Sequence, residues 1–331
     1  MTGPVVSIVM PMYNARPFVA EAIESVLRQD YGNFELVIVD DGSTDGGSDV
    51  VERFRDPRIR LIRTENRGLS AARNLGIARS VGDYVTFLDS DDLLTTKSVS
   101  SRVDGLKKYQ GECVFSREIL VINILERYKP ICMPSNRSHQ EVGRIWPATD
   151  LIEGFIEGRF FAFVHGFLIP RSILQSVGGF DESIKMTEDV EFLTRLLPSC
   201  RSIVETFETF YIYRRTPRSL SAIDSRQKAT EKLRALRQSH RNLAPYLCGR
   251  ETWIAQSLFN YCAEAYPYWT SDHRAAMAEA RRLRGDKPFD LAWVGGRRAQ
   301  AVARFFGWRA GRLSTFASSF VRRSLRLRGR L

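Results

Sequence analysis

Short apolar runs and amphipathic segments alternate along the N-terminal part of the chain. The apolar runs are rich in Val, Ile and Leu, which is typical of strands covered on both faces of a sheet. These runs occupy 5–10, 34–39, 58–63 and 84–88. Helices are expected between them, at 17–29, 50–54 and 69–80. Strands that alternate with helices in this way predict an α/β fold with a mostly parallel, doubly wound sheet flanked by helices.

Acidic residues follow two of the predicted strands. Asp40 and Asp41 come directly after the second strand, and Asp89, Asp91 and Asp92 follow the fourth. Ligands of doubly wound sheets bind beyond the carboxyl ends of the strands, so both clusters are expected on one rim. Carboxylates gathered in one turn repel each other, and Mg²⁺ or Mn²⁺ prefers oxygen ligands and nucleotide phosphates. The pattern therefore predicts a metal and nucleotide site.

Two other interpretations compete with a metal site. In the first, Asp92 or Ser90 simply caps the helix that follows the acidic turn. In the second, the chain is a dinucleotide-binding dehydrogenase, which requires a GxGxxG turn after the first strand. The sequence there reads MPMYNA, so this class is excluded. Two carboxylate clusters at equivalent strand ends favour the metal and nucleotide site over capping.

The pattern is less regular after residue 95. We expect a helix at 97–108, one or two strands at 113–123, a long polar loop at 126–143, a strand at 165–170, a short helix at 171–177 and a strand at 208–214. Thr187-Glu188-Asp189 opens another helix, where the helix dipole alone would favour the two acids. His165 begins an expected strand, and a lone imidazole in that place is assigned to packing, with a catalytic or acceptor-binding role as the alternative.

Helical patterns dominate the C-terminal region. Helices are expected at 227–242, 251–266, 273–283 and 299–328, with a break at 307–311 in the last. Arginines accumulate after Asp290 and no acid follows it, so the net charge of +11 belongs largely to this tail. Such a basic amphipathic segment lies in an anionic membrane interface, packs on the main domain with a solvated basic face, or is partly disordered. No nucleic-acid-binding motif accompanies the charge, so no nucleic acid partner is expected.

Composition indicates a globular protein in a reducing compartment. Hydrophobic residues make up 44% of the 331 residues, enough for a substantial core. The five cysteines are widely spaced and contain no CxxC pair, which argues against a disulfide framework or a zinc site. We find no signal peptide pattern and no apolar stretch long enough to span a membrane. We therefore expect a cytoplasmic protein, with peripheral contact to the inner face of the cell membrane as a further hypothesis.

Three motifs together resemble one enzyme family. VSIVMPMYN, FELVIVDDGSTD and ENRGLSAARNLGIARSVGDYVTFLDSDD, in this order and spacing, are similar to family 2 glycosyltransferases, inverting enzymes of the GT-A fold that use nucleotide sugars. The resemblance runs from about Val5 to Ser221. It implies a GT-A domain at 1–222, with a mixed, mostly parallel, Rossmann-like sheet. Residues 223–331 then form a helical C-terminal region that ends in the basic tail.

The resemblance also implies roles for individual residues. Pro11 and Tyr13 would line the nucleotide pocket, Asp40 would contact the base or ribose, and Arg73 would lie near the nucleotide. Simpler alternatives are that Tyr13 packs under its loop and that Arg73 pairs with a carboxylate on the surface.

The DxD pair and the catalytic base come from the same resemblance. Asp89 and Asp91 would form the pair, with Asp89 also beside the nucleotide and Asp91 in direct contact with Mg²⁺ or Mn²⁺. Family members carry GGFDE followed by an acidic pair, as in this chain, which implies Asp189 as the catalytic base and Glu188 as the alternative base. Inversion needs such a carboxylate because an acceptor hydroxyl must lose its proton as it attacks the anomeric carbon.

One position departs from the family pattern. Thr216 stands where many relatives carry a histidine that helps to hold the metal or diphosphate, and threonine is a poor metal ligand. The sequence leaves two possibilities: the DxD side and the phosphates hold the metal alone, or Arg214, Arg215 and Arg218 contact the diphosphate directly.

The combined expectation is a glycosyltransferase that moves a sugar from a nucleotide-diphosphate donor, a UDP-sugar, to a saccharide or lipid-linked saccharide acceptor in surface or exopolysaccharide biosynthesis. A sugar nucleotidyltransferase would also need a metal and a nucleotide, but its Gly-rich phosphate loop is missing near the N-terminus. The remaining alternative is a non-catalytic basic protein that binds membrane or nucleic acid and retains a nucleotide-binding fold.

Overall fold

The computed structural model describes residues 3–116, 119–123, 131–132, 143–156, 163–207, 211–215, 226–265, 270–287 and 289–290. The chain divides into two compact units, Met1–Ala222 and Ile223–Leu331. The predicted tail helix at 299–328, Thr216 and Arg218 lie outside the described residues, as does most of the predicted loop at 126–143. The side chain of Arg215 is also outside them.

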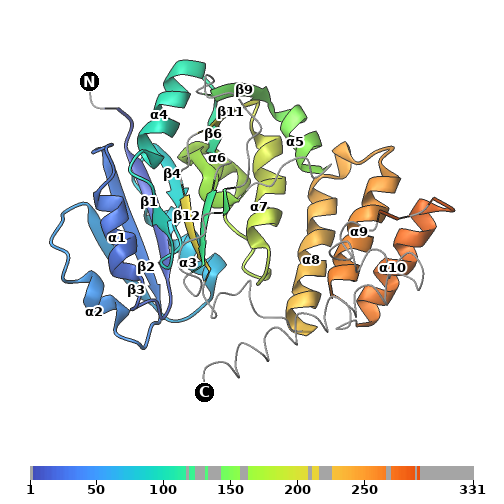
Figure 1. Ribbon diagram of the computed structural model, residues 1–331, viewed down its shortest axis with the longest axis horizontal. Helices are drawn as coiled ribbons and strands as arrows, with labels where there is room; N and C mark the ends of the chain where they lie inside the picture. The colour runs from blue at the N-terminus through green and yellow to red at the C-terminus, as the bar shows by residue number, and fades with distance from the viewer. Residues whose placement is uncertain are drawn as a thin grey trace. The chain divides into compact units, whose positions relative to one another are not determined.

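A mixed, mostly parallel sheet forms the centre of the first unit (Figure 1). Its order is β3-β2-β1-β4-β10-β6-β11-β9, and β1 to β4 run parallel to one another. β10 is antiparallel to both β4 and β6. The strands are β1 (Val6–Met12), β2 (Phe34–Asp41), β3 (Ile59–Thr64), β4 (Tyr84–Phe87), β6 (Cys113–Ser116), β9 (Gly143–Pro147), β10 (Phe167–Pro170) and β11 (Ser202–Thr206). The predicted fold class is confirmed.

A second, four-stranded sheet has the order β5-β12-β7-β8. Its strands are β5 (Leu93–Leu94), β12 (Tyr211–Arg215), β7 (Ile119–Asn123) and β8 (Ile131–Cys132). β5 directly follows the acidic turn at Asp89–Asp92, and β12 pairs antiparallel with β5. This small sheet therefore brings a distant part of the chain to the acidic turn.

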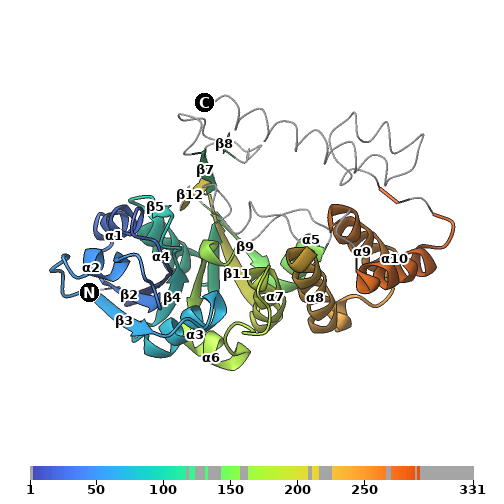
Figure 2. The same ribbon diagram turned by 90° about the horizontal axis from the view of Figure 1, so that it is seen from below.

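Helices cover both faces of the main sheet (Figure 2). α1 (Val19–Leu27) and α4 (Ser98–Tyr109) lie on one face, where Ile8 and Leu36 belong to the same core as Ile23 and Val103. α3 (Leu69–Arg79) lies on the opposite face against Val37 and Val39, together with α6 (Arg171–Val177) and α7 (Glu188–Leu196). Two further helices are α2 (Gly47–Val51) and α5 (Ala148–Ile156).

Pro11 lies inside β1, although the sequence predicts that the strand ends before it. The reason is local. The backbone carbonyl of Val9 accepts a hydrogen bond from the N–H of Leu88 (3.0 Å), so the backbone polar groups of Val9 point toward β4. The backbone nitrogen of Pro11, two residues later, points to the same side. The pairing of β1 with β4 ends at Val9 and Phe87, so no β4 residue pairs with Pro11. The missing N–H of the proline therefore breaks no ladder hydrogen bond, and β1 continues beside β2 to Met12.

Two other element predictions were wrong in detail. The strand expected at 165–170 begins only at Phe167, because Val164–Gly166 forms a single 3₁₀ turn, so His165 lies before the strand. β11 was not predicted, although Ile203 and Val204 are fully buried within it. The predicted helix at 171–177 is confirmed as α6.

Among the residues of the second unit that the structure describes, three α-helices form: α8 (Arg226–Asn242), α9 (Glu251–Ala265) and α10 (Ser271–Arg284). Their shared core includes Leu233, Phe259 and Met277. A capping box between Thr270 and His273 starts α10. Across the described part of the chain, the helices are too short or too polar for any of them to span a membrane.

We predict that Gly76→Ala destabilises the first unit. A Cβ at Gly76 of α3 would clash with a methyl group of the fully buried Val9 in β1, because the helix lies so close to the sheet. The free energy of unfolding should fall by about 1–3 kcal/mol, as for other overpacked cores. Urea unfolding measures this change. Gly32→Ala is the matched control, because a Cβ there meets no atom within 4 Å. Equal stability of the two variants would contradict the tight contact.

Candidate active site

The acidic turn after β4 holds three carboxylates close together. Oxygen atoms of Asp89, Asp91 and Asp92 lie within 4.8 Å of one another. They form the one cluster, among the residues that the structure describes, with three acidic, His or Cys ligands near enough to share a metal ion. β4 ends at Phe87, so this turn lies at the carboxyl end of a central strand. The predicted position of the acidic site on the sheet agrees with this arrangement.

Asp92 fixes the turn to β12. Its side chain is buried, and its two oxygens accept hydrogen bonds from the Tyr211 hydroxyl (2.7 Å) and the Arg214 backbone N–H (2.7 Å). The Arg214 guanidinium also donates to the Asp91 carbonyl and to Glu21. Burial, followed by the charges of Asp91 and Asp89, raises the pKa of Asp92.

The capping interpretation of this turn is wrong. α4 is the next helix after the turn, begins only at Ser98, and has no side-chain cap at Lys97. Asp92 instead accepts its hydrogen bonds from β12, a strand far along the chain.

Asp89 is held by two cationic or polar side chains. Arg73 Nη2 lies 3.0 Å from Asp89 Oδ1, and His165 Nε2 lies 3.1 Å from Asp89 Oδ2. Burial alone would raise the pKa of Asp89, but His165 and Arg73 outweigh that effect and hold the pKa below its ordinary range. The ring of His165 lies 5.0 Å from the ring of Tyr211. The packing role assigned to His165 was therefore incomplete, because its ring nitrogen contacts the acidic turn.

Arg73 connects the acidic turn to α7. Only 1% of this residue is exposed, and its Nη1 lies 2.7 Å from Glu188 Oε1 while Nη2 contacts Asp89. Burial would lower its pKa, but the charges of Asp89, Glu188 and Asp189 more than offset this and raise the pKa above the ordinary value. The surface ion pair considered for Arg73 is thus wrong, since the pair is internal. Contact between Arg73 and a nucleotide stays a prediction.

Glu188 and Asp189 start α7 and differ in their surroundings. Thr187 precedes them in a left-handed conformation (φ 58°). Glu188 is buried against Arg73. Asp189 Oδ1 instead accepts a hydrogen bond from the N–H of Val190 (2.8 Å), and no other described residue donates a hydrogen bond to Asp189. Burial, followed by the charge of Glu188, raises the pKa of Asp189 to about 6, against the opposing effect of Arg73. Asp189 is therefore the acid with more free capacity to accept a proton.

The carboxylates outnumber the cations around this site. Two arginines, Arg73 and Arg214, face five carboxylates, those of Asp89, Asp91, Asp92, Glu188 and Asp189. Burial, followed by the charge of Asp89, raises the pKa of Asp91 to about 6. An all-oxygen cluster with this excess of negative charge fits a hard divalent cation, such as Mg²⁺ or Mn²⁺.

The two acids at the end of β2, Asp40 and Asp41, hold loops. Asp40 is buried and accepts hydrogen bonds from the Ser43 N–H (2.8 Å) and the Ser48 hydroxyl. Asp41 accepts the N–H groups of Arg67 and Gly68, each at 2.8 Å, immediately before α3. These contacts fix the rim between β2 and α3. Contact between Asp40 and a base or ribose stays a prediction.

The two predicted pocket residues of β1 lie in different environments. Pro11 is buried in the strand, and Tyr13 just beyond its end is 53% exposed. The alternative in which Tyr13 packs under its loop is therefore wrong. Asn14 follows with φ 48° and accepts the Thr44 N–H (2.8 Å), so the loops after β1 and β2 are joined. Tyr13 is thus presented outward at the rim.

Sequence reasoning missed the roles of Tyr211 and His165. Neither residue belongs to a local motif that indicates its partner. Asp92, the partner of Tyr211, lies 119 positions earlier in the chain, and Asp89, the partner of His165, lies 76 positions earlier. Only the pairing of β12 with β5, and the 3₁₀ turn before β10, bring them to the acidic turn.

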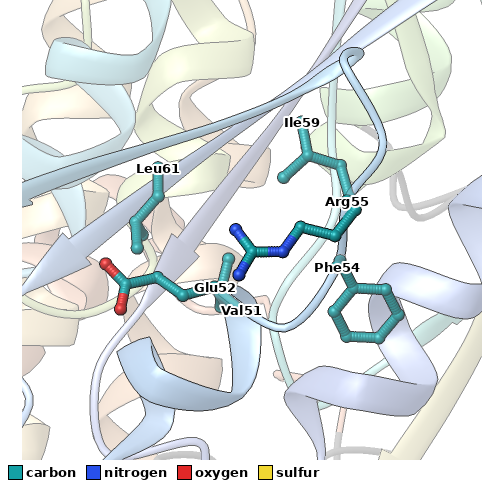
Figure 3. Close-up of a pocket in the computed structure, with 6 residues that line it drawn as sticks. All are labelled: Val51, Glu52, Phe54, Arg55, Ile59 and Leu61. Carbon is teal, nitrogen blue, oxygen red and sulfur yellow. The ribbon is translucent and has the colours of Figure 1, made fainter.

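A surface depression of about 330 Å³ lies elsewhere, between the end of α2 and the edge strand β3 (Figure 3). Its lining residues are Val51, Glu52, Phe54, Arg55, Ile59 and Leu61. It contains none of the acids of the β4 turn or of α7, so it is not the candidate active site.

Comparison with known sequences identifies relatives of the chain. The sequence model described as "Glycosyl transferase family 2" matches residues 7–167. EpsJ of Bacillus subtilis, an uncharacterized glycosyltransferase, is 32% identical over 233 residues, which cover 70% of this chain and 67% of EpsJ. The minor teichoic acid biosynthesis protein GgaA of B. subtilis is 30% identical over 246 residues, which cover 66% of this chain but only 49% of GgaA.

Solved structures share the fold. TarS residues 1–349 of S. aureus, in complex with UDP-GlcNAc, superimpose with a TM-score of 0.62 at 17% identity, covering 95% of this chain and 92% of that one. The mannosyltransferase PcManGT of Pyrobaculum calidifontis, in complex with GDP-Man and Mn²⁺, gives a TM-score of 0.55 at 19% identity, covering 94% of this chain and 84% of that one.

We predict that Asp91→Asn removes a metal-dependent stabilisation. Mn²⁺ should raise the melting temperature of the wild type, because it neutralises the charge of Asp91 beside Asp89. The rise should be smaller at about pH 5 than at about pH 7.5, because protons compete with Mn²⁺ for Asp91 below its pKa of about 6. Without metal, the variant should melt above the wild type, because a repelled and partly buried charge is gone. Differential scanning fluorimetry measures both effects. An unchanged Mn²⁺ shift in the variant would argue against this site.

Proposed function

The chain belongs to glycosyltransferase family 2, and we propose that it transfers a sugar with inversion from a UDP-sugar to a saccharide or lipid-linked saccharide of a surface polysaccharide. The name of one relative supports this acceptor class, because GgaA is a minor teichoic acid biosynthesis protein. The fold relatives contain UDP, UDP-GlcNAc or GDP-Man, which supports a nucleotide sugar as the donor.

The internal bridge through Arg73 is the observation that carries this proposal. Arg73 contacts Asp89 in the acidic turn and Glu188 at the start of α7, so one guanidinium joins the proposed metal site to the helix start that carries the proposed base. Inverting transfer needs both parts in one site, because the nucleotide leaves from one face of the sugar and the acceptor hydroxyl attacks from the other.

We assign the catalytic base to Asp189. Glu188 is paired with Arg73 at 2.7 Å, so its carboxylate is already engaged by a guanidinium. Within the described part of the chain, Asp189 accepts one hydrogen bond, from the N–H of Val190. Its pKa is raised by burial to about 6, which suits a base that works near neutral pH. In the transfer, Asp189 takes the proton of the acceptor hydroxyl, and the hydroxyl oxygen forms the new bond to the anomeric carbon. The bond from that carbon to the donor's diphosphate oxygen breaks, and the nucleotide diphosphate leaves with the electron pair.

Asp91 and Asp89 would hold the divalent cation. Asp91 is the better ligand, since both oxygens of Asp89 already contact Arg73 and His165. The cation, when bound, neutralises negative charge on the diphosphate. Tyr13 is exposed at the rim, close in sequence to Pro11 and joined through Asn14 to the loop held by Asp40, which supports a nucleotide pocket along β1 and β2.

We predict that Asp189→Asn reduces transfer by about 10²- to 10⁴-fold, the usual contribution of a general base. Glu188→Gln should leave a base in place and act only through the lost contact with Arg73, so its effect should be smaller. Thermal stabilisation by UDP-GlcNAc, UDP-glucose, UDP-galactose and GDP-mannose with Mn²⁺ selects the donor, and nucleotide release then measures turnover.

The pH profile gives a second test of the base. In the wild type, kcat/KM should rise with pH through a value near 6, because Asp189 must lose its proton before it can accept one. The acid limb should disappear in Asp189→Asn. If Asp189→Asn retains full turnover while Glu188→Gln loses it, Glu188 is the base instead.

The basic tail supports a location at the inner face of the cell membrane as part of this proposal. After Asp290 the sequence contains arginines and aromatic residues but no acid, a composition suited to anionic headgroups. A lipid-linked acceptor would be found at the same surface.

We predict that a chain ending at Asp290 loses binding to vesicles that contain phosphatidylglycerol, because it lacks the arginine-rich segment. Vesicle sedimentation measures the bound fraction. Vesicles of phosphatidylcholine alone are the control and should bind neither chain strongly, since they offer no net negative charge. Equal binding of the full and shortened chains to anionic vesicles would contradict a membrane role for the tail.

A further inference from the structure

A turn between α6 and α7 is hydrogen-bonded at two points to the side chain of Asn74 in α3. Asn74 of α3 accepts the Phe180 N–H at Oδ1 (2.7 Å) and donates from Nδ2 to the Phe180 carbonyl (2.9 Å). Its Nδ2 also lies 3.1 Å from Glu182 Oε1. Both ends of the amide match the backbone groups that they face, so the orientation of the Asn74 side chain is fixed by this contact. The turn gains a defined position on α3.

Gly179 makes this contact sterically possible. A Cβ built on Gly179 would lie 2.7 Å from Asn74 Cγ and still closer to its Oδ1. Any larger residue at this position would therefore push the Asn74 side chain away from Phe180. The obstacle is the Asn74 side chain itself, so it should vanish when residue 74 is shortened to alanine.

The same contact places the ring of Phe180 beneath Arg73. The guanidinium of Arg73 lies 5.2 Å from the ring centroid. The ring stacks on Phe192 of α7 (4.4 Å) and meets the edge of Phe87 at the end of β4 (5.4 Å). Phe180 thus contacts α3, α7 and β4 at once. A shift of its backbone would move the start of α7 relative to the acidic turn.

Two further contacts join the turn to the start of α3. Arg67 pairs with Glu182 (3.1 Å), and the Ser70 hydroxyl donates to the carbonyl of Ile184 (3.4 Å). The Arg67–Glu182 pair is exposed and contributes little by itself. The two-point contact of Asn74 with Phe180 is the most defined link between the turn and the helix that carries Arg73.

We propose that Asn74 is a positioning residue that fixes the distance and angle of α7, and with it Asp189, relative to the donor side of the site. This inference rests on the proposed function, because it gives Asp189 the task of deprotonating the acceptor. Among the described residues, the Asn74 side chain hydrogen-bonds to Phe180 and Glu182, so its proposed action runs through the turn and α7. The donor side, under the proposed function, is built on the ends of β1, β2 and β4, which none of these hydrogen bonds reaches.

Three variants of the full chain test the proposal: Asn74→Ala, Gly179→Ala and the double variant. Gly32→Ala is the matched control, because its added Cβ meets no atom within 4 Å. Turnover is measured as nucleotide release, UDP affinity in the presence of Mn²⁺ by calorimetry, and local opening by amide hydrogen exchange of peptides that cover residues 179–190. The exchange measurement needs no active donor and no acceptor.

We expect each single variant to lower kcat by about 10- to 100-fold, as small displacements of catalytic groups do, while the Kd for UDP changes by less than about threefold. Exchange should increase at 179–190 and remain unchanged in peptides of β1 and β2. In the Asn74→Ala background, Gly179→Ala should have almost no further effect, because the atom with which its Cβ clashes is absent. Gly32→Ala should behave as the wild type.

Three results would overturn the proposal. The first is unchanged exchange at 179–190 in Asn74→Ala. The second is a loss of turnover that follows an equal loss of UDP affinity, which would indicate general damage instead of a displaced base. The third is a full additional effect of Gly179→Ala in the double variant. A wild type that releases no nucleotide from any tested donor would instead contradict the proposed function, and the exchange measurements would still decide whether Asn74 holds α7.

Discussion

The buried guanidinium of Arg73 is the interaction on which the geometry of the site depends. A charge with 1% exposure is stable only beside opposite charges, and Asp89 and Glu188 provide them at 3.0 and 2.7 Å. α3, which carries Arg73, is packed tightly on β1 through Gly76, so the position of the guanidinium is set by the sheet. The acidic turn and α7 must therefore meet at Arg73. Removal of one partner from such a buried pair typically costs about 3–5 kcal/mol, because the other charge is left uncompensated.

The acids of this site are distinguished by their hydrogen-bond partners, since their residue type is almost the same. Asp41 and Asp92 each accept backbone N–H groups from distant segments, and they hold those segments in place. Asp91 and Asp189 have fewer partners, and burial raises the pKa of each to about 6. The first group maintains the structure of the rim. The second group has capacity left for a cation or a proton, which is the division of roles that transfer chemistry requires.

Local patterns in the sequence were sufficient for the order of strands and helices from β1 to α3, because apolar periodicity and turn residues act over short distances. The acidic clusters were also placed correctly at strand ends. The division of roles among the acids could not be predicted, since the partners of Asp92 and Asp89 are Tyr211 and His165, which only the tertiary fold brings near. The strand through Pro11 was missed for a related reason: whether proline is tolerated there depends on where the neighbouring strand β4 ends.

The charge balance of the site also constrains how a nucleotide sugar would enter it under the proposed function. Five carboxylates face Arg73 and Arg214, and both arginines are already paired, with Glu188 and with Glu21 among others. A diphosphate that approached alone would meet further negative charge and no free cation among these residues. A divalent cation at Asp91 would reverse the sign of the local field. The donor and the metal are therefore best regarded as one binding unit, with Asp189, which lies outside the three-aspartate cluster of the turn, left as the acid that the metal does not neutralise.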